Sequence, residues 1–360
     1  KGMTHSVRIA GREIGPGRPP FLVAEMSANH GGDFDRAVAV LRAAKTAGAD
    51  AVKLQTYTAD TLTIDADNEH FRIKGTLWDG RTLYDLYREA AMPWEWTPRL
   101  VAAGADLGLP VFSTPFDASA VDFLESLDVP AHKVASFELV DIPLLRKIGA
   151  TGRPVIASTG MASLAEIDEA VRTLRASGCG ELVLLKCVSA YPAPPEEMRL
   201  AAMALLSRAF VCPAGLSDHT LGLTVPVAAT ALGACCIEKH FTLSRDLPGP
   251  DSAFSLTPDE FAAMAKASRE AFAALGEPDF SPTPKEQASR AFRRSLFVVA
   301  DVRAGEAFTP ENVRSIRPAG GLHTRCLELV LGRRASRDVA RGTPLSWDLV
   351  GGPHPGGDRP

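Results

Sequence analysis

The feature that most constrains the fold is a regular alternation of short apolar runs and longer amphipathic runs over the first 280 residues. The short runs are rich in valine, isoleucine, leucine and alanine, which is typical of buried parallel strands, and the longer runs have the apolar spacing of helices. Eight strands are predicted, at 21–27, 51–56, 110–115, 132–136, 154–159, 182–189, 214–219 and 236–241. Eight strand-then-helix units over about 260 residues predict an α/β fold, a (β/α)8 TIM barrel.

The amphipathic runs predict one helix after each strand. These helices are expected to begin near Asp33, Trp96, Ala118, Ile142, Leu164, Glu196, Leu221 and Pro258. The last start is the best defined, because Thr257 can cap a helix that has proline at its first position. An open doubly wound sheet is the alternative, but no GxGxxG phrase follows the first strand.

The composition changes where the alternation ends. Residues 276–287 are polar and rich in proline, as in a linker. Beyond them the phrases VRAGEAFTPENV and VARGTPLSWDLV resemble each other and indicate an internal repeat in a compact β-rich unit. We therefore expect a barrel domain at 1–280, a linker at 281–290, a small domain at 291–351 and a disordered tail at 352–360.

Charge and hydropathy limit the classes of partner. The net charge of −4 and the pI near 6.1 give no reason to expect nucleic acid or a membrane as partner. No apolar run reaches membrane-spanning length, and the first residues lack the apolar core of a signal peptide. The six cysteines have no CxxC spacing, which is typical of buried thiols in a reducing compartment. The expected location is cytoplasmic.

Two histidines follow the last two predicted strands. Because chemistry in barrels collects at the carboxyl ends of the strands, His219 and His240 are expected at one mouth. Two imidazoles on adjacent strand ends could bind a divalent metal and leave positions open for water and substrate oxygens. The alternative is a pair of hydrogen-bonded structural histidines. Glu238 shares a face with His240, either beside the metal or in a core ion pair.

Basic side chains and carboxylates lie at the same strand ends. Lys53, Lys133 and Lys186, with neighbouring hydroxyl groups, indicate a site for a small anion that carries phosphate and carboxylate. The carboxylates available as base, acid or sugar ligand are Glu25, Glu138 and Asp251. With a metal that polarises a carbonyl, this set predicts carbon–carbon bond formation between a phosphorylated enolate equivalent and an aldehyde.

The segment at 57–93 is too long for an ordinary strand-to-helix loop. Apart from a short amphipathic run at 83–91, it has little helix or strand periodicity. Its place after the second strand puts it at the predicted mouth, where it could serve as a substrate lid. A structural flap or an interface segment is the alternative.

Nearly the whole chain resembles the sialic acid synthase family, which condenses phosphoenolpyruvate with an N-acetylated amino sugar. The phrases that carry the resemblance are AEMSANHGG, AGADAVKLQTYT, FSTPFD, HKVASFE, ASTGMA, GLSDHTLG, IEKHFT and PGPDSAFSL. The last unit, with SIRPAGGLH and GTPLSWDL, resembles the family's C-terminal antifreeze-like (SAF) domain.

The resemblance implies roles for particular residues. The metal, Mn2+ with Mg2+ or Co2+ as alternatives, would be held by His219 and His240. Phosphoenolpyruvate would be held by Lys53, Thr114, Lys133, Ser136, Ser158, Ser189 and Ser217. The sugar would be held by Glu25, Gln55, Tyr191, Asp251 and Arg317. The catalytic set would be Glu138, Glu25, His219 and His240, with Glu138 moving a proton. Arg317 would reach the barrel of a second subunit, which implies a domain-swapped homodimer.

Sugar choice within the family is a finer question. The phrases SANH, SFE and LKCVSAYPAP and the 77–96 loop resemble the branch that makes pseudaminic acid from 2,4-diacetamido-2,4,6-trideoxy-L-altrose. Because that sugar lacks a 6-hydroxyl, an apolar pocket from Phe137, Trp78 or Tyr84 would suit it. The alternatives are a synthase of N-acetylneuraminate or legionaminate, and a non-catalytic sugar-binding member of the family.

Overall fold

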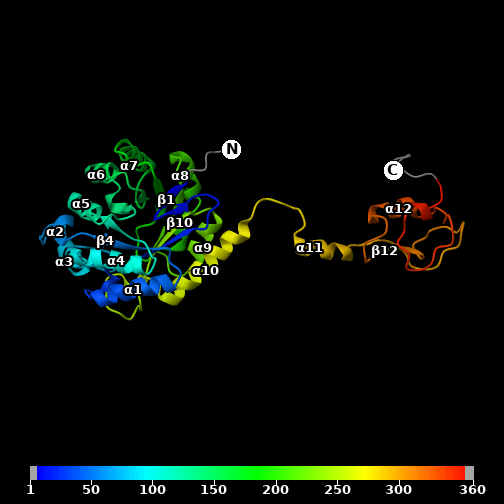
Figure 1. Ribbon diagram of the computed structural model, residues 1–360, viewed down its shortest axis with the longest axis horizontal. Coiled ribbons are helices and arrows are strands. Elements are labelled where there is room, and N and C mark those ends of the chain that lie inside the picture. The colour runs from blue at the N-terminus through cyan, green and yellow to red at the C-terminus, as the bar shows by residue number, and fades with distance from the viewer. Residues whose placement is uncertain (1–5, 353–360) are drawn as a thin grey trace. The chain divides into compact units, whose positions relative to one another are not determined.

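The computed structural model describes residues 6–352, and its larger unit is a closed barrel of eight parallel strands (Figure 1). The wall runs in the order β10-β3-β4-β5-β6-β7-β8-β9. Its strands are β3 (Phe21–Glu25), β4 (Ala51–Thr56), β5 (Val111–Pro115), β6 (His132–Val134), β7 (Val155–Ser158), β8 (Leu182–Cys187), β9 (Ala214–Asp218) and β10 (Cys236–His240). Each coincides with a predicted strand, so the TIM-barrel prediction is confirmed.

The helices that follow the strands are α1 (Phe34–Thr46), α4 (Thr97–Asp106), α5 (Ala118–Ser126), α6 (Ile142–Ala150), α7 (Leu164–Ala176), α8 (Ala202–Phe210), α9 (Thr224–Ala231) and α10 (Pro258–Leu275). Capping residues determine where several of these helices begin. Ser163 and Glu166 form a capping box on α7, and Thr257 forms one with Glu260 on α10. The predicted start near Glu196 is wrong, because Pro195–Glu197 forms only a 3-10 turn before α8.

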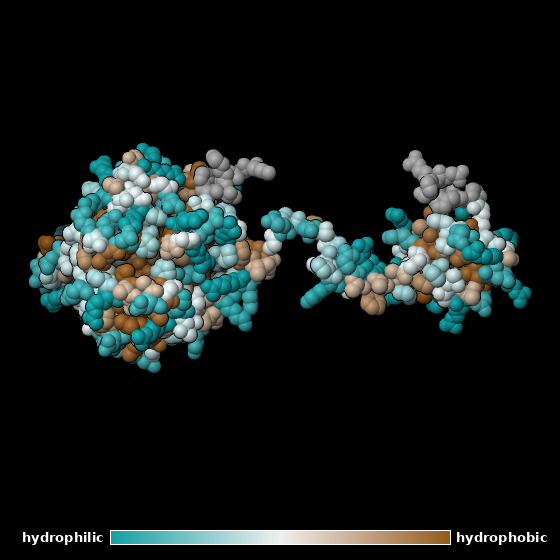
Figure 2. Space-filling model, in the orientation of Figure 1, coloured by the Kyte–Doolittle hydropathy of each residue, from teal (hydrophilic) through white to brown (hydrophobic). Residues whose placement is uncertain are grey.

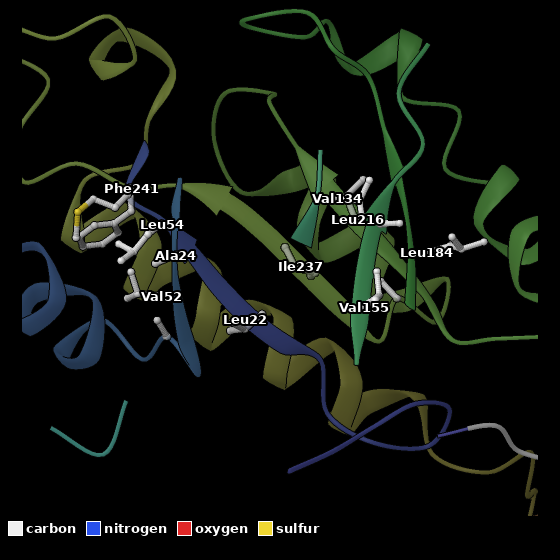
Figure 3. Packing of buried hydrophobic residues seen from close by; sticks show 14 of the residues in the cluster. Leu22, Ala24, Val52, Leu54, Val134, Val155, Leu184, Leu216, Ile237 and Phe241 are labelled. Atoms are coloured by element: carbon white, nitrogen blue, oxygen red, sulfur yellow. The ribbon is translucent and has the colours of Figure 1, made fainter. Parts of the chain in front are cut away.

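Two apolar clusters lie on the two sides of the barrel wall. The outward-facing strand residues pack against the surrounding helices, and Figure 3 shows Leu22, Val52, Leu184 and Ile237 in this cluster. The inward-facing residues near the amino ends of the strands form a second cluster. A hairpin that the sequence analysis did not predict, β1 (Val7–Ile9) and β2 (Arg12–Ile14), adds its apolar side chains to that second cluster. We call this end of the barrel the floor.

The segment at 57–93 contains α2 (Ala59–Leu62) and α3 (Leu83–Ala90), so the short amphipathic run is confirmed as a helix. Between the two helices, Arg72 pairs with Thr82 in an isolated bridge. The indole nitrogen of Trp78 donates to the carbonyl of Pro250 at 3.1 Å, which ties this flap to the loop after β10.

The chain divides into two compact units, Lys1–Gly276 and Glu277–Pro360. Within the predicted linker, the second unit has a short helix, α11 (Pro284–Ser289), which begins at a capping box of Thr283 and Glu286. Its other elements are β11 (Ser295–Val298), β12 (Val313–Ile316) and α12 (Leu327–Val330). The predicted tail lies, apart from Gly352, outside the described residues. Both units have a mainly hydrophilic surface on the face shown in Figure 2.

Short 3-10 turns connect several of these elements. They are η1 (Ser27–His30), η2 (Trp94–Trp96), η3 (Ser136–Glu138), η4 (Pro195–Glu197), η5 (Ser252–Phe254), η6 (Arg290–Phe292), η7 (Thr324–Cys326) and η8 (Trp347–Leu349). Two of them, η1 and η3, follow barrel strands directly and carry polar side chains to the carboxyl end of the barrel.

The two similar phrases of the second unit have matching bonds. Val302 and Val339 exchange backbone hydrogen bonds at 2.9 and 2.8 Å. The backbone amide of Arg341 donates to Asp301 at 2.8 Å, and that of Ala304 donates to Asp338 at 2.7 Å. The aspartate just before each phrase thus caps the turn of the other phrase, as expected for an internal repeat.

Candidate active site

A cavity of about 340 Å³ opens at the carboxyl end of the barrel, which we call the mouth. Strand-end residues supply its polar lining: Glu25, Lys53, Gln55, Lys133, Ser158, Ser217, Glu238 and His240. The loops that follow the strands add Ser27, Ser136, Glu138, Tyr191, His219 and Asp251. The flap adds apolar side chains, among them Leu62, Ile73, Trp78, Leu83, Leu86 and Tyr87. One space therefore has a charged base and a partly apolar wall.

The two histidines line this cavity as neighbours, with ring centroids 5.4 Å apart and ring planes inclined at 58°. The Nδ1 atom of His219 lies 2.8 Å from the carbonyl of Val188, so a proton on Nδ1 leaves the Nε2 lone pair free. The Nδ1 atom of His240 is buried without a hydrogen-bond partner. Burial lowers the pKa of His240 well below its usual value, which keeps that ring neutral. Two imidazoles with free ring nitrogens fit a divalent cation.

The histidines stand without a third protein ligand. Across residues 6–352, no three histidine, cysteine, aspartate or glutamate side chains converge in a metal-binding arrangement. Burial alone would lower the pKa of His219, but its contacts with Cys187 and Val188 raise it. A divalent cation held by the two rings would compete with the proton on His219. Water and substrate oxygens would occupy the remaining coordination positions of that cation.

The two predicted lysines lie at the base of the mouth. The Nζ atom of Lys53 is 3.0 Å from Glu238 Oε1 and 3.1 Å from Glu25 Oε2. Lys133 donates to the hydroxyl of Ser158 at 2.7 Å, and its Nζ atom lies 3.7 Å from Glu238. The question left open for Glu238 is resolved, because it forms the ion pair that partly neutralises both lysines.

Lys186 does not join the other lysines. It occupies an outward position on β8, next to the cavity-lining Cys187, and its Nζ atom donates to the Cys187 carbonyl at 2.9 Å. Strand alternation explains the difference, because Lys53 and Lys133 occupy inward positions on their strands. The expectation that three lysines converge is therefore wrong for Lys186.

The carboxylates of the mouth have unusual environments. Glu25 accepts from the side-chain amide of Gln55 at 2.9 Å, and Asp251 accepts from the hydroxyl of Ser27 and, at 3.3 Å, from the amide of Ala28. Burial raises the pKa of Glu25 and Asp251 above their usual values. Burial also raises the pKa of Glu138 to about 7. A carboxyl group that titrates near neutral pH is suited to moving a proton in either direction.

Several buried polar atoms at the mouth have no hydrogen-bond partner among the described residues. They are Oε2 of Glu138 and Glu238, Nδ1 of His240 and, in the wall behind the cavity, Oγ1 of Thr114. Leaving such an atom unpaired costs about 1–3 kcal/mol. Their concentration at one end of the barrel indicates groups that await a ligand.

Most predicted site residues therefore line one cavity. The exceptions are Thr114, which is buried in the wall beside Gln55; Ser189, which packs against Gly160 without lining the cavity; and Arg317, which is exposed in the second unit. Of the predicted apolar residues, Trp78 and Phe137 line the cavity, but Tyr84 does not, because its hydroxyl donates to Asp60 at 3.2 Å.

Several lining residues were given no site role in the prediction from the sequence. Ser27 and Tyr57 line the cavity, and so does Cys187, whose sulfur lies 3.9 Å from Nδ1 of His219. Burial opposes ionisation of this thiol, but the contact with His219 lowers its pKa to about 7. Alternation along β8 could have identified Cys187, since Val183 and Leu185 share its face.

The fold and this mouth define a class: a barrel enzyme whose mouth has the charges for a small anion beside a candidate metal site. Comparison with known proteins identifies the family. The NeuB family matches residues 40–279, and the SAF domain matches residues 293–351. The chain belongs to the NeuB family, carries a SAF domain, and is an enzyme of the sialic acid synthase type. The resemblance stated from the sequence is thereby confirmed.

Individual relatives cover most of the chain. It is 44% identical over 334 residues to a pseudaminic acid synthase of Helicobacter pylori, covering 92% of this chain and 98% of that protein. It is 37% identical to an N,N'-diacetyllegionaminic acid synthase of Legionella pneumophila, covering 92% and 94%. The crystal structure of the spore coat polysaccharide biosynthesis protein spsE of Bacillus subtilis matches with a TM-score of 0.66 and 35% identity, covering 96% and 99%. No helix within residues 6–352 is long and apolar enough to cross a membrane.

Proposed function

We propose that this protein is a pseudaminic acid synthase. It joins phosphoenolpyruvate to the open-chain aldehyde of 2,4-diacetamido-2,4,6-trideoxy-L-altrose and releases phosphate by C–O cleavage. The observation that carries the proposal is that one cavity holds Lys53, Lys133 and the His219–His240 pair. The greater identity to the pseudaminic acid synthase than to the legionaminic acid synthase supports this choice of product.

Phosphoenolpyruvate binds at the base of the mouth. Lys53 and Lys133 supply two positive charges; among the carboxylates of residues 6–352, Glu238 alone lies within 4 Å of both, and Glu25 pairs with Lys53. Hydroxyl donors surround them: Ser136, Ser158 and Ser217 at the cavity, with Thr114 and Ser189 behind it. Lysine ammonium groups with hydroxyl donors suit an anion that bears both phosphate and carboxylate.

His219 and His240 hold the metal, which we propose to be Mn2+, with Mg2+ or Co2+ as alternatives. When bound, such an ion supplies Lewis-acid polarisation of the sugar aldehyde. The protein's part is to fix the two ring nitrogens and to keep the cavity small, so that both substrates lie close together in the correct orientation.

The remaining polar groups orient the sugar and move protons. Glu25, Gln55, Tyr191 and Asp251 line the cavity and contact the sugar. C3 of phosphoenolpyruvate attacks the aldehyde carbon, water adds at C2, and the tetrahedral intermediate loses phosphate to leave a nine-carbon 2-keto acid. Glu138, with its pKa near 7, takes or gives the proton in this sequence.

The flap favours a sugar with apolar substituents. Trp78 and Phe137 line the cavity together with several aliphatic residues of the flap, among them Leu62, Ile73, Leu83 and Leu86. The methyl group at C6 and the two acetamido methyl groups of the proposed sugar would bury apolar area against this wall. A 6-hydroxyl would lose water there without gaining a partner.

Arg317 acts from the second unit of a partner subunit in a domain-swapped homodimer. Its planar guanidinium suits an acetamido carbonyl. Mixing the variants Arg317→Ala and His219→Ala tests this arrangement, because a swapped dimer of the two contains one barrel with intact groups from both subunits. Recovery of activity on mixing supports the swap, and additive loss contradicts it.

The function is tested by phosphate release with phosphoenolpyruvate, Mn2+ and a panel of amino sugars. We expect the highest kcat/KM with 2,4-diacetamido-2,4,6-trideoxy-L-altrose. Turnover with N-acetylmannosamine or a legionaminate precursor instead would identify the chain as an N-acetylneuraminate or legionaminate synthase. Sugar binding without any phosphate release would favour a non-catalytic sugar-binding protein.

A further inference from the structure

The strands that bear the two histidines have a second charged pair on their other face. Along β9 and β10, Ser217 and Glu238 face the cavity, whereas Asp218 and Lys239 face away from it. Both outward side chains are only 1% exposed, so a full ion pair is buried behind the barrel wall. Each of its members is adjacent in sequence to one of the candidate metal ligands.

This pair also holds the backbone around His219. One carboxylate oxygen of Asp218 accepts from the amide of Thr220 at 3.0 Å, and the other accepts from its hydroxyl at 3.1 Å. The Nζ atom of Lys239 donates both to Asp218 and to the carbonyl of Thr220. The residues on either side of His219 are thus bonded to each other and to the residue before His240.

The pair lies where the two strands separate. Lys239 and Asp218 are the last register partners of the β9–β10 ladder. Beyond them, His240 pairs with Glu25 of β3, while the carbonyl of His219 accepts from the amide of Ala193 at 2.9 Å. The two histidine-bearing segments then follow different neighbours, so the Asp218–Lys239–Thr220 contacts are the last link between them before the ligands.

A buried ion pair is not needed here for stability alone. Replacing such a pair with well-packed apolar residues of similar volume is often neutral or stabilising. What the charged groups provide, and an apolar pair would not, is a set of directed bonds that fixes the backbone. A metal with only two protein ligands depends strongly on the spacing and orientation of those ligands.

We propose that Asp218 and Lys239 are positioning residues that set the spacing of His219 and His240 for one divalent cation. The inference rests on the metal role of the histidine pair in the proposed function. It extends the candidate metal site to the outer face of the barrel wall, where neither residue touches substrate or metal.

The test measures Mn2+ binding without substrates, from the electron paramagnetic resonance signal of free Mn2+. In Lys239→Met and Asp218→Asn we expect the Mn2+ dissociation constant to rise by about 10- to 100-fold, as for other residues that orient metal ligands. The affinity for phosphoenolpyruvate, measured in EDTA, should change by less than about twofold, since the lysines of the mouth are untouched. If Lys239→Met fails to fold, Asp218→Asn carries the test.

Asp50→Asn is the matched control. Asp50 lies at the other end of the wall, where it forms an ion pair with Arg12 and accepts from the amide of Leu22 at 2.9 Å. This variant should lose stability but keep the parent's Mn2+ affinity. The proposal is overturned if both test variants bind Mn2+ within about twofold of the parent, or if Mn2+ and phosphoenolpyruvate affinities fall together. A parent that binds no Mn2+ would refute the metal role itself.

Discussion

The two ends of the barrel are built from the same strands with opposite chemistry. At the floor, inward side chains such as Val23 and Ala51 pack with Ile9 and Ile14 of the hairpin in an apolar cluster. At the mouth, two positions further along the same strands, the inward residues are Glu25 and Lys53. Because every second residue of a strand points inward, the same face of each strand is apolar at the floor and charged at the mouth.

The two ends differ in how completely their buried groups find favourable partners. The floor consists of apolar side chains that bury their surface and stabilise the fold. The mouth contains buried charges and unpaired polar atoms, which cost stability. Substitutions at the mouth should therefore remove activity with little loss of stability, and substitutions at the floor should do the reverse.

Among the variants that test this comparison, His219→Ala should have the largest effect. We expect kcat to fall by about 10³-fold or more, because a Lewis acid supplies several kcal/mol to the transition state and about 1.4 kcal/mol is worth a factor of ten. His132→Gln is the matched control, since His132 is buried outside the cavity and pairs with Glu125. Steady-state kinetics with Mn2+ measure both. Full activity of His219→Ala would disprove the metal assignment.

Lys133→Met should act mainly on substrate binding. The loss of a buried charge-assisted bond costs about 1.5–3 kcal/mol, so the KM for phosphoenolpyruvate should rise by roughly 10- to 100-fold. Lys186→Met is the control, because that lysine faces away from the cavity. An equal rise in KM for both variants would mean that charge near the mouth, rather than a specific contact, holds the anion.

Glu138→Gln should separate activity from stability. Because burial raises the pKa of Glu138 from 4.5 to about 7, the folded chain holds a proton between these pH values that the unfolded chain has released. The free energy of unfolding therefore falls as pH rises from about 4.5 to about 7. At pH 8 the variant should be more stable than the parent by about 1–3 kcal/mol, although turnover is lost.

Denaturant unfolding at pH 5 and pH 8 measures this difference in stability. Glu169→Gln, on the exposed face of α7, is the control, and it should keep the pH dependence of the parent because Glu138 is unchanged. If Glu138→Gln differs from the parent equally at both pH values, the raised pKa is wrong.

Ile9→Ala tests the floor. Removing this fully buried side chain should lower the free energy of unfolding by about 2–4 kcal/mol. Its kcat should remain within about twofold of the parent at temperatures where the variant is folded, because no floor residue lines the cavity. A large loss of kcat in the folded variant would contradict the separation of the two ends.

The sequence predicted the barrel because each strand is a short, almost fully apolar run. Strand parity also placed Lys53, Gln55, Glu238 and His240 correctly, since alternation fixes which side chains face inward. The hairpin was missed because its three-residue strands are too short to show a period. The start of α8 was misplaced because prolines before it favour a 3-10 turn.

Contacts between distant segments could not be predicted in this way. That Trp78 rather than Tyr84 reaches the cavity depends on its bond to Pro250, far along the chain. Similarly, the bond between Ser27 and Asp251 joins the first strand end to the last loop of the barrel. Such pairs depend on loop conformation, and strand and helix periods carry no information about it.

The most direct test of the central claim, that the mouth condenses phosphoenolpyruvate with an amino sugar, uses phosphoenolpyruvate labelled with 18O at the bridging oxygen. The enzyme is incubated with Mn2+ and 2,4-diacetamido-2,4,6-trideoxy-L-altrose, and product and phosphate are analysed by mass spectrometry. The account predicts a nine-carbon 2-keto acid and one 18O atom in each phosphate released. Unlabelled phosphate, or phosphate without a condensed sugar product, would contradict it.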